Sequence, residues 1–572
     1  MGRGTSPALG IAALLLLLCA ADLRAQVELL ELTHPATAAL VRLYEAGAIP
    51  RFPREHLPIS RGDARRYLLE AAADPSLDPA LRSLAADHAA VLAREGGGEG
   101  LILPSSTTGR SFWSDPLADR PLAIAEWSDS AGPSRVLLEP IGYSEVRLDP
   151  QQKRTVIVGL LGAGVRVSLY DVLGAAARVV NGSVAGDSLL AARDSVLVQS
   201  GSFGITGFGR DIGIADAHVR LAWRGLSAEV GHDRVQLGGG LDRSLLLGSR
   251  LGSSYDYLRF GLAFGPFRFT HLHGWLLSPF NVNARGPLPT DPDPQRFVAA
   301  HLITFDPSDA VRVSLGEATI YHGRGFELGY LNPLLFFKDQ EQYLGDRDNG
   351  NMYLSIGLRP VRGVYAEGEM LLDDLRFSEI GSGYWSNKIA WRGALRAVGL
   401  LHPSVDVGTE YTRVEPFTFS HFNPENAYTH RGMTLAGENL QPNSWKLALN
   451  ATWNPSARVR FDAEFGVGEH GANILAHDSL GGGDTLVFNA GGDVAQTHRF
   501  IDSPTATFLA GTLEQLTHCR VLAHVALLGS ASLFGGVEYS RVAGPDTTVQ
   551  AVQLRIGLTV GGRWQAQGTT IR

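Results

Sequence analysis

Cysteine, basic clusters and long hydrophobic runs are scarce in this chain of 572 residues. Its two cysteines, Cys19 and Cys519, cannot form a disulfide framework once a leader that contains Cys19 is removed. The net charge is −8 and no basic stripe occurs, which argues against a nucleic-acid partner. After the leader, no segment has the roughly 18 consecutive apolar residues that a membrane-spanning helix needs.

Residues 1–25 are expected to be a secretory signal peptide. Arg3 supplies the positive start, an apolar stretch follows over residues 11–21, and Ala25 ends a cleavage site. The apolar stretch is too short to span a bilayer as a helix. An exported chain without a membrane helix, but with many alternating apolar residues, is typical of a transmembrane barrel.

Residues 26–95 are predicted to form a small helical domain, and a Gly- and Ser-containing linker, residues 96–109, follows it. The start signals of its three helices are His34-Pro35, Ser60 with Asp63 in a capping box, and Asp78-Pro79. Gly47 closes the first helix. Because the unit is small, we expect it to dock on a larger body.

From about residue 110 the hydrophobic period changes to two. Apolar residues at 459, 461, 463, 465 and 467 alternate with Arg458, Arg460, Asp462, Glu464 and Gly466. Strict alternation places one set of side chains on each face of a β-strand. Two architectures fit: a sheet that covers a core, or a closed barrel with an apolar face toward lipid and a charged face toward a wet lumen.

The spacing of the strands favours the barrel. Further alternating runs cover residues 165–169, 219–223, 258–264, 311–315, 352–358, 445–449, 521–527 and 552–560. Turns such as Gly265-Pro266 and Asn454-Pro455 mark hairpins, whereas the connections 280–296, 414–443 and 469–506 are long, polar and aromatic. Short turns at one end and long loops at the other are typical of outer-membrane barrels. We predict a barrel over residues 110–564 and a tail at 565–572; a soluble all-β solenoid would require a repeat of fixed length, which is not visible.

The densest polar and aromatic stretch begins at Tyr321 and ends at Asn351. Over residues 205–375 the chain contains, in order, DR, GGG, SLLLGS, YHGRGFELGYLNPLLFF, E, DN, RP, GE and LLDD. This order resembles the capsule-assembly Wzi family of outer-membrane proteins, and YLNPLLFF and DN are its specific parts. The resemblance implies an all-β transmembrane barrel of about 18 antiparallel strands with a periplasmic helical bundle. It also implies a lectin that holds capsular polysaccharide at the cell surface, although the identity of the sugar does not transfer.

The same stretch supplies the chemistry of a glycan site. Sugars are bound by aromatic faces beside carboxylate, amide and guanidinium groups that hydrogen-bond to hydroxyls. The glycan-binding candidates are Tyr321, Tyr330, Glu341, Tyr343, Asp346, Arg347, Asp348 and Asn349. Two structural roles compete with binding: aromatic residues often form the girdle at the membrane interface, and inward-facing charges often form ion pairs that brace the lumen.

Neither a metal site nor a catalytic set is predicted. His271 and His273 share a strand face, but no third ligand has a fixed spacing, so we expect a lumen pair and not a metal site. Glu367 and Glu369 are expected to be lumen carboxylates, because spacing in sequence does not show that two acids are paired for glycoside hydrolysis. No cofactor is implied.

The sequence therefore favours a non-enzymatic outer-membrane lectin that binds or organises capsular or other surface polysaccharide. Its barrel would be surrounded by outer-membrane lipid, with the helical domain in the periplasm. A porin-like or polysaccharide-conducting channel is the alternative, and an open, water-filled lumen would distinguish it. A membrane-embedded hydrolase is a third interpretation. Whether the helical domain contacts polysaccharide export machinery stays open.

Overall fold

The structure is a computed structural model that describes most of the chain after the leader. The described residues are 26–95, 99–103, 110–115, 119–129, 134–191, 193, 210–240, 243–248, 254–278, 295–437, 439–476, 485–529, 531–545 and 547–561. The predicted signal peptide, most of the linker, nearly all of the connection 280–296 and the C-terminal tail lie outside them.

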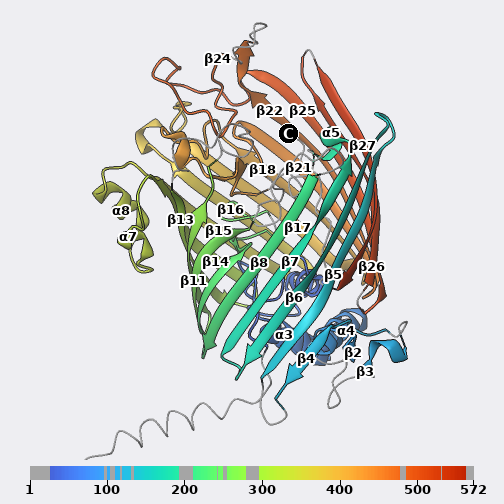
Figure 1. Cartoon of the computed structure of the whole chain (residues 1–572). Coiled ribbons are helices and arrows are strands. Elements are labelled where there is room, and N and C mark those ends of the chain that lie inside the picture. The colour runs from blue at the N-terminus through green and yellow to red at the C-terminus, as the bar shows by residue number, and fades with distance from the viewer. Residues whose placement is uncertain are drawn as a thin grey trace, which may run out of the picture.

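Eighteen antiparallel strands within the described residues close a barrel (Figure 1), which confirms the predicted fold class. They are β5 (Arg135–Asp149), β6 (Arg154–Leu169), β7 (Leu173–Gly186), β8 (Arg210–Trp223), β9 (Leu226–Asp233), β11 (Tyr255–Phe264), β12 (Phe267–Leu276), β13 (Arg296–Ser308), β14 (Val311–His322), β15 (Asn349–Val361), β16 (Val364–Asp374), β17 (Lys388–His402), β18 (Val405–Val414), β21 (Ser444–Ser456), β22 (Val459–Ala472), β25 (Thr512–Leu528), β26 (Ala531–Ala543) and β27 (Thr548–Gly561). Each pairs with the next barrel strand, and β27 pairs with β5 to close the ring.

Shorter elements lie around and inside the barrel. They are β1 (His56–Leu57), β2 (Glu99–Leu101), β3 (Arg110–Ser111), η1 (Phe112–Ser114), β4 (Ala125–Ser128), α5 (Ser188–Ala191), β10 (Gln236–Leu237), α7 (Leu328–Leu331), α8 (Phe337–Tyr343), η2 (Phe377–Glu379), η3 (Pro424–Asn426), β19 (Thr429–His430), β20 (Met433–Thr434), β23 (Ile474–Ala476) and β24 (Thr485–Phe488). β4 pairs with the beginning of β5. The first long strand thus begins at Arg135, and the division of domains at residue 110 stays a prediction.

The two faces of the strands follow the predicted alternation. On β22, Phe465 points outward and is 46% exposed, whereas its neighbour Glu464 points into the lumen and is 6% exposed. The same holds for the outward Leu315 and the inward Arg312 on β14. On these two strands the outward residue of each pair is apolar and exposed, and the inward residue is charged and buried.

The connections differ in length at the two ends of the barrel. At one end the turns are as short as 224–225, 265–266 and 362–363, and at the other end the loops include 323–348 and 473–511. Figure 1 shows the long loops at the upper end and the helices α3 (Arg61–Ala73) and α4 (Pro79–Glu95) at the lower end. The predicted contrast between short turns and long loops is confirmed.

One predicted turn is wrong in position. β21 continues through Asn454 and Pro455 to Ser456, and the turn of this hairpin lies at 457–458. The pairing of β21 with β22 shifts register between Trp453 and Ser456. Proline cannot donate to a ladder and is tolerated at such irregularities, so Pro455 marks a bulge near the end of the strand.

Three helices form the N-terminal domain: α2 (Pro35–Glu45), α3 (Arg61–Ala73) and α4 (Pro79–Glu95). Ser60 caps α3 as predicted, because its Oγ accepts from the backbone N–H of Asp63 at 3.1 Å. Gly47 has a φ of +80°, the conformation that ends α2. None of the helices in the described part of the chain is long and apolar enough to cross a membrane.

The helical domain closes the short-turn end of the barrel. Tyr44 and Phe52 share a buried core with Tyr365 of β16 and Val398 of β17. The following segment enters the lumen, where β1 pairs with β10. There the ring of His56 contacts Thr270 and Thr304 of the inner wall, each at 2.8 Å. The predicted docking of this small domain on a larger body is therefore confirmed.

Candidate functional site

Two segments fold into the lumen from the long-loop end. Segment 234–248 and loop 415–443, without residues 241, 242 and 438, pack together, and the hydroxyl of Tyr428 donates to the carbonyl of Leu246 at 2.5 Å. The backbone N–H of Gly238 donates to the carbonyl of Glu55 at 3.0 Å. Since Glu55 belongs to the N-terminal segment, the chain that enters from one end of the lumen meets the chain that enters from the other.

An ion-pair network connects these lumen segments to the barrel wall. It runs through Glu45, Arg54, Glu367, Arg392, Glu410, Arg243 and Glu464. Arg392 is 1% exposed at its side chain and lies 2.6 Å from Glu410, and Arg243 lies 2.6 Å from Glu464. Glu367 is therefore a lumen carboxylate, as expected, and so is Glu369, which lies 2.7 Å from Arg392. A buried charge left without its partner costs about 3–5 kcal/mol, so the network holds the lumen segments in place.

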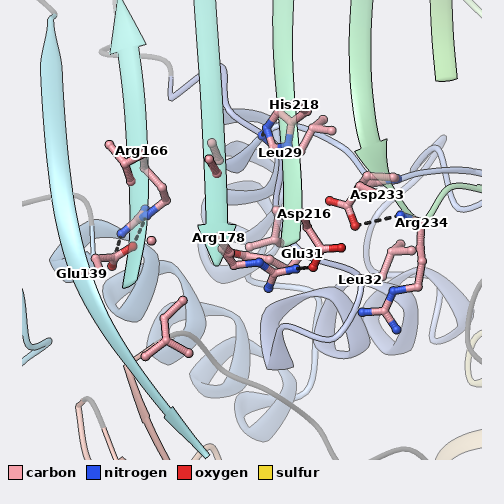
Figure 2. Close-up of a pocket in the computed structure, with 17 residues that line it drawn as sticks. Leu29, Glu31, Leu32, Glu139, Arg166, Arg178, Asp216, His218, Asp233 and Arg234 are labelled. Atoms are coloured by element: carbon pink, nitrogen blue, oxygen red, sulfur yellow. Dashed lines mark hydrogen bonds and ion pairs between the residues drawn. The ribbon is translucent and has the colours of Figure 1, made fainter. Parts of the chain in front are cut away.

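Two small cavities lie between the N-terminal segment and the barrel wall in the described part of the chain. Figure 2 shows one of about 30 Å³, in which Arg166 pairs with Glu139 and Arg178 pairs with Asp216. A second cavity, of about 80 Å³, separates α2 from the wall near His524. Volumes of this size hold a few water molecules at most. A sugar residue does not fit in either cavity.

The dipeptide Asp348-Asn349 lies on the rim of the barrel and connects its outside to its inside. The carboxylate of Asp348 accepts two bonds from Arg324, at 2.9 and 2.6 Å, and one from the hydroxyl of Tyr330 at 2.9 Å. Asn349 points inward and donates to the carbonyl of Asn426 in loop 415–443 at 2.8 Å. One residue thus holds the segment that lies outside the wall, and its neighbour holds the loop inside the lumen.

Segment 323–348, which contains α7 and α8, is called the flap below. In Figure 1 it lies outside the ring of strands, beside β13. Tyr330 and Phe337 pack on the outward residues Phe297, Ala299 and Tyr321 of β13 and β14. The backbone N–H of Phe337 donates to a carboxylate oxygen of Glu317 at 2.7 Å. The flap is therefore fixed to the outer wall by both apolar and polar contacts.

The eight candidate residues divide into two groups. Five are buried: Tyr321, Tyr330, Glu341, Asp348 and Asn349. Three are exposed: Tyr343, Asp346 and Arg347. The structure brings the buried group together around the rim, where each member has a partner within the chain. In this conformation only the exposed group is open to a ligand, and the binding role of all eight stays a prediction.

The expected lumen pair of His271 and His273 is wrong. Both point outward, because His271 pairs across the strands with His301 and with the outward Phe260, and both are buried under the flap. His273 Nε2 lies 2.7 Å from the hydroxyl of Tyr321. The period of two placed the histidines on one face, but it could not show which face a distant segment covers. Among the described residues, no group of three or more His, Cys, Asp or Glu side chains could hold a metal ion.

Glu341 of α8 is a titratable group in the closed flap. Burial raises the pKa of its carboxyl from the ordinary 4.5 to about 7, and Lys338, at 2.9 Å, opposes the shift. Asp346 and Asp348 also raise this pKa. Because the raised pKa belongs to the closed flap, protonation of Glu341 stabilises closure, and that stabilisation is lost as the pH rises through 7.

We therefore expect the flap to open more readily at pH 8 than at pH 5. Hydrogen exchange of backbone amides in residues 328–343, measured on the folded protein at both values and corrected for intrinsic rates, reports the opening. Glu341→Gln should protect the flap equally at both values, because the neutral amide does not titrate. Asp339→Asn, at an exposed position of the same helix, is the control and should keep the pH dependence of the native chain. Equal protection of the native flap at both values would contradict the expectation.

Sequence reasoning did not single out the aromatic cluster of loops 375–387 and 473–511. Trp385 stacks on His498 with ring centroids 3.9 Å apart and an angle of 9° between planes. Arg376 lies over the ring of Tyr384 at 4.8 Å. Aromatic rings beside guanidinium and amide groups suit sugars, so this cluster is a second candidate surface at the long-loop end. The consecutive Tyr384 and Trp385 in a polar connection were the available signal.

Comparisons with known proteins bear on the fold. No protein-family model and no curated protein sequence matches the chain. Among solved structures, Wzi from Escherichia coli is an outer membrane protein involved in group 1 capsule assembly and a carbohydrate-binding β-barrel; the match has a TM-score of 0.56 and 13% identity, and covers 94% of this chain and 100% of that chain. OprD from Pseudomonas aeruginosa matches with a TM-score of 0.41 and 9% identity over 74% of this chain and 94% of its own. The chain therefore shares the barrel fold of Wzi, and the resemblance to the capsule-assembly family is confirmed at the level of the fold.

Proposed function

We propose that the protein is a non-enzymatic outer-membrane barrel that binds or organises capsular or other surface polysaccharide at the cell surface. The observation that carries this proposal is a lumen that described segments enter from both ends, in a barrel whose long polar and aromatic loops, among the described residues, lie at one end. Wzi, which has the same fold, is a carbohydrate-binding barrel.

The orientation follows from the turns. In outer-membrane barrels short turns face the periplasm and long loops face outward. The helical domain lies at the short-turn end, so we place it in the periplasm, where it is available to polysaccharide export machinery. The outward apolar wall would contact outer-membrane lipid, and the long loops would meet the polymer outside the cell.

The exposed side chains at the long-loop end would supply weak contacts to sugar units. Tyr343 offers an aromatic face, and Asp346 and Arg347 offer groups that hydrogen-bond to hydroxyls. A polymer that meets many copies of the protein binds by avidity, so each contact can be weak. A catalytic role is not part of the proposal: the carboxylate of Asp373 accepts from the backbone N–H of Phe419 at 2.6 Å and lies 3.5 Å from Lys388, which is a bracing role.

The channel alternative requires an open lumen. The described residues of segments 234–248 and 415–443 meet the N-terminal segment inside the barrel, and the ion pairs of Arg54 and Arg392 join them to its wall. A path for water-filled conduction would have to displace these contacts. The filled lumen therefore favours a binding protein over a channel.

Glycan-array binding of the purified, detergent-folded protein tests the proposal. We expect binding to capsule-type acidic or neutral polymers and a loss of at least about tenfold in apparent affinity for the double variant Tyr343→Ala, Arg347→Ala, a loss that corresponds to roughly 1.4 kcal/mol. Tyr170→Ala is the matched control, because Tyr170 is as exposed but lies in a turn at the opposite end. Absence of binding to every polymer, or equal losses in both variants, would count against a glycan site on the flap side of the long-loop end.

A further inference from the structure

The flap covers a polar part of the outer wall. The outward positions beneath it carry His271, His273, His301 and Glu317, and His301 Nε2 lies 3.4 Å from a Glu317 carboxylate oxygen. On the strands around them, outward positions are apolar, which is the rule for a wall that faces lipid. Four ionisable or polar side chains at such positions are unfavourable against hydrocarbon, so this part of the wall needs a cover.

The flap also continues the apolar surface that it covers. Phe337 lies with its ring centroid 4.4 Å from that of His301. The next outward residue of β13 is Ile303, which pairs with Leu315 of β14, and both are exposed. Ile303 and Leu315 are the first residues of the exposed apolar band of the outer wall, which is called the belt below. The flap therefore reaches down the wall to the upper border of this belt.

The outer side of the flap is apolar and uncharged like the belt, whereas a loop in water usually carries polar and charged side chains. Residues 328–337, LGYLNPLLFF, contain no charged side chain. Leu328 is 79% exposed and Leu334 is 91% exposed, and Phe336 is exposed beside them. The charged residues of the flap, such as Arg324 and Lys338, lie on either side of this uncharged stretch.

We propose that the outer side of the flap lies in the outer leaflet and that Leu328, Leu334 and Phe336 contact lipid acyl chains. The flap then replaces the wall as the lipid-facing surface and keeps the histidine and glutamate groups away from hydrocarbon. Continuity with the apolar belt is what selects lipid over a partner protein or a second copy of the chain. The inference rests on the proposed outer-membrane location of the barrel.

Spin labels with two collision agents test the inference. The background carries Cys19→Ser and Cys519→Ser, and nitroxide is attached to Leu334→Cys, Leu315→Cys or Phe500→Cys in protein folded into phosphatidylcholine vesicles. Oxygen concentrates in acyl chains, whereas a neutral nickel chelate stays in water. Position 315 represents the belt, and position 500 represents a fully exposed loop at the long-loop end. Leu334 is almost fully exposed, so its replacement should not disturb folding.

We expect the logarithm of the oxygen-to-nickel collision ratio to be positive at 315 and 334 and negative at 500. A negative value at 334 with a positive value at 315 overturns the lipid contact and leaves the membrane barrel intact. Low access of both agents at 334 assigns the surface to a protein contact and also overturns it. A negative value at 315 overturns the membrane location itself, which separates failure of the proposed function from failure of the inference.

Discussion

Replacing Arg54 with methionine is expected to release the helical domain from the barrel while the strands stay paired. Arg54 is fully buried and forms ion pairs with Glu45 and Glu367, and its guanidinium also donates to the hydroxyl of Tyr365 at 2.9 Å. Loss of the cation removes one partner from each of two buried carboxylates, and leaves Glu367 with Arg392 at 3.0 Å and Glu45 with Arg396 at 3.6 Å. Such a loss costs about 3–5 kcal/mol, which is a large part of the stability of a small docked domain.

Limited proteolysis and conductance measure the release. Cleavage within residues 26–95 should accelerate in the variant, while the barrel still migrates as a heat-modifiable band on a gel. In planar bilayers the native protein should show no large steady steps. The variant should show only small or short-lived openings, because the N-terminal segment leaves its part of the lumen while segments 234–248 and 415–443 still occupy the other part. Arg66→Met is the control: Arg66 is about half exposed and pairs with Asp63 and Glu70, so its loss should change stability by no more than about 1 kcal/mol. Large steady steps from the native protein would instead favour the channel alternative.

The sequence predicted the barrel well, because alternation is a local property. Phe465 and Glu464 lie on opposite faces of β22 for the same reason that they alternate in the chain. The helix start at Ser60 is local in the same sense, since the cap and its partner Asp63 are three residues apart. The family motifs then indicated the closed architecture that the fold comparison bears out.

The candidate site could not be predicted to the same degree, because its contacts are long-range. Tyr330 and Asp348 have the chemistry of a sugar site, but in the structure they bind each other, and composition does not distinguish the two uses. His271 and His273 were assigned to one face correctly and to the lumen wrongly, since the flap that buries them begins some fifty residues later in the chain. Likewise, nothing local shows that segment 234–248 turns into the lumen to meet Glu55.

The double substitution Asp348→Ala, Asn349→Ala should weaken glycan retention at the cell surface without reducing barrel assembly. Asp348→Ala removes three hydrogen bonds that hold Arg324 and Tyr330, and a buried, charge-paired carboxylate of this kind contributes about 3 kcal/mol. Asn349→Ala removes the bond to the carbonyl of Asn426, worth about 1 kcal/mol. The barrel strands themselves keep all their ladder bonds, so heat-modifiability on a gel should be unchanged.

The single variants separate the two sides of the rim. Asp348→Ala acts on the flap, and should raise hydrogen exchange in residues 328–343 while loop 415–443 stays protected. Asn349→Ala should do the reverse, because the side chain of Asn349 bonds to Asn426 of the loop inside the lumen and to Asn351 of the wall. Asp339→Ala is the matched control, since Asp339 is an exposed acidic residue of the same flap and is not one of the glycan candidates. If retention by the double variant equals that of the native protein at equal surface levels, Asp348 and Asn349 do not position a glycan site, and the half-buried aromatic cluster around Trp385 becomes the surface to test. If only Asp348→Ala lowers retention, the polymer depends on the flap, whose position on the outer wall would place the glycan beside the membrane surface.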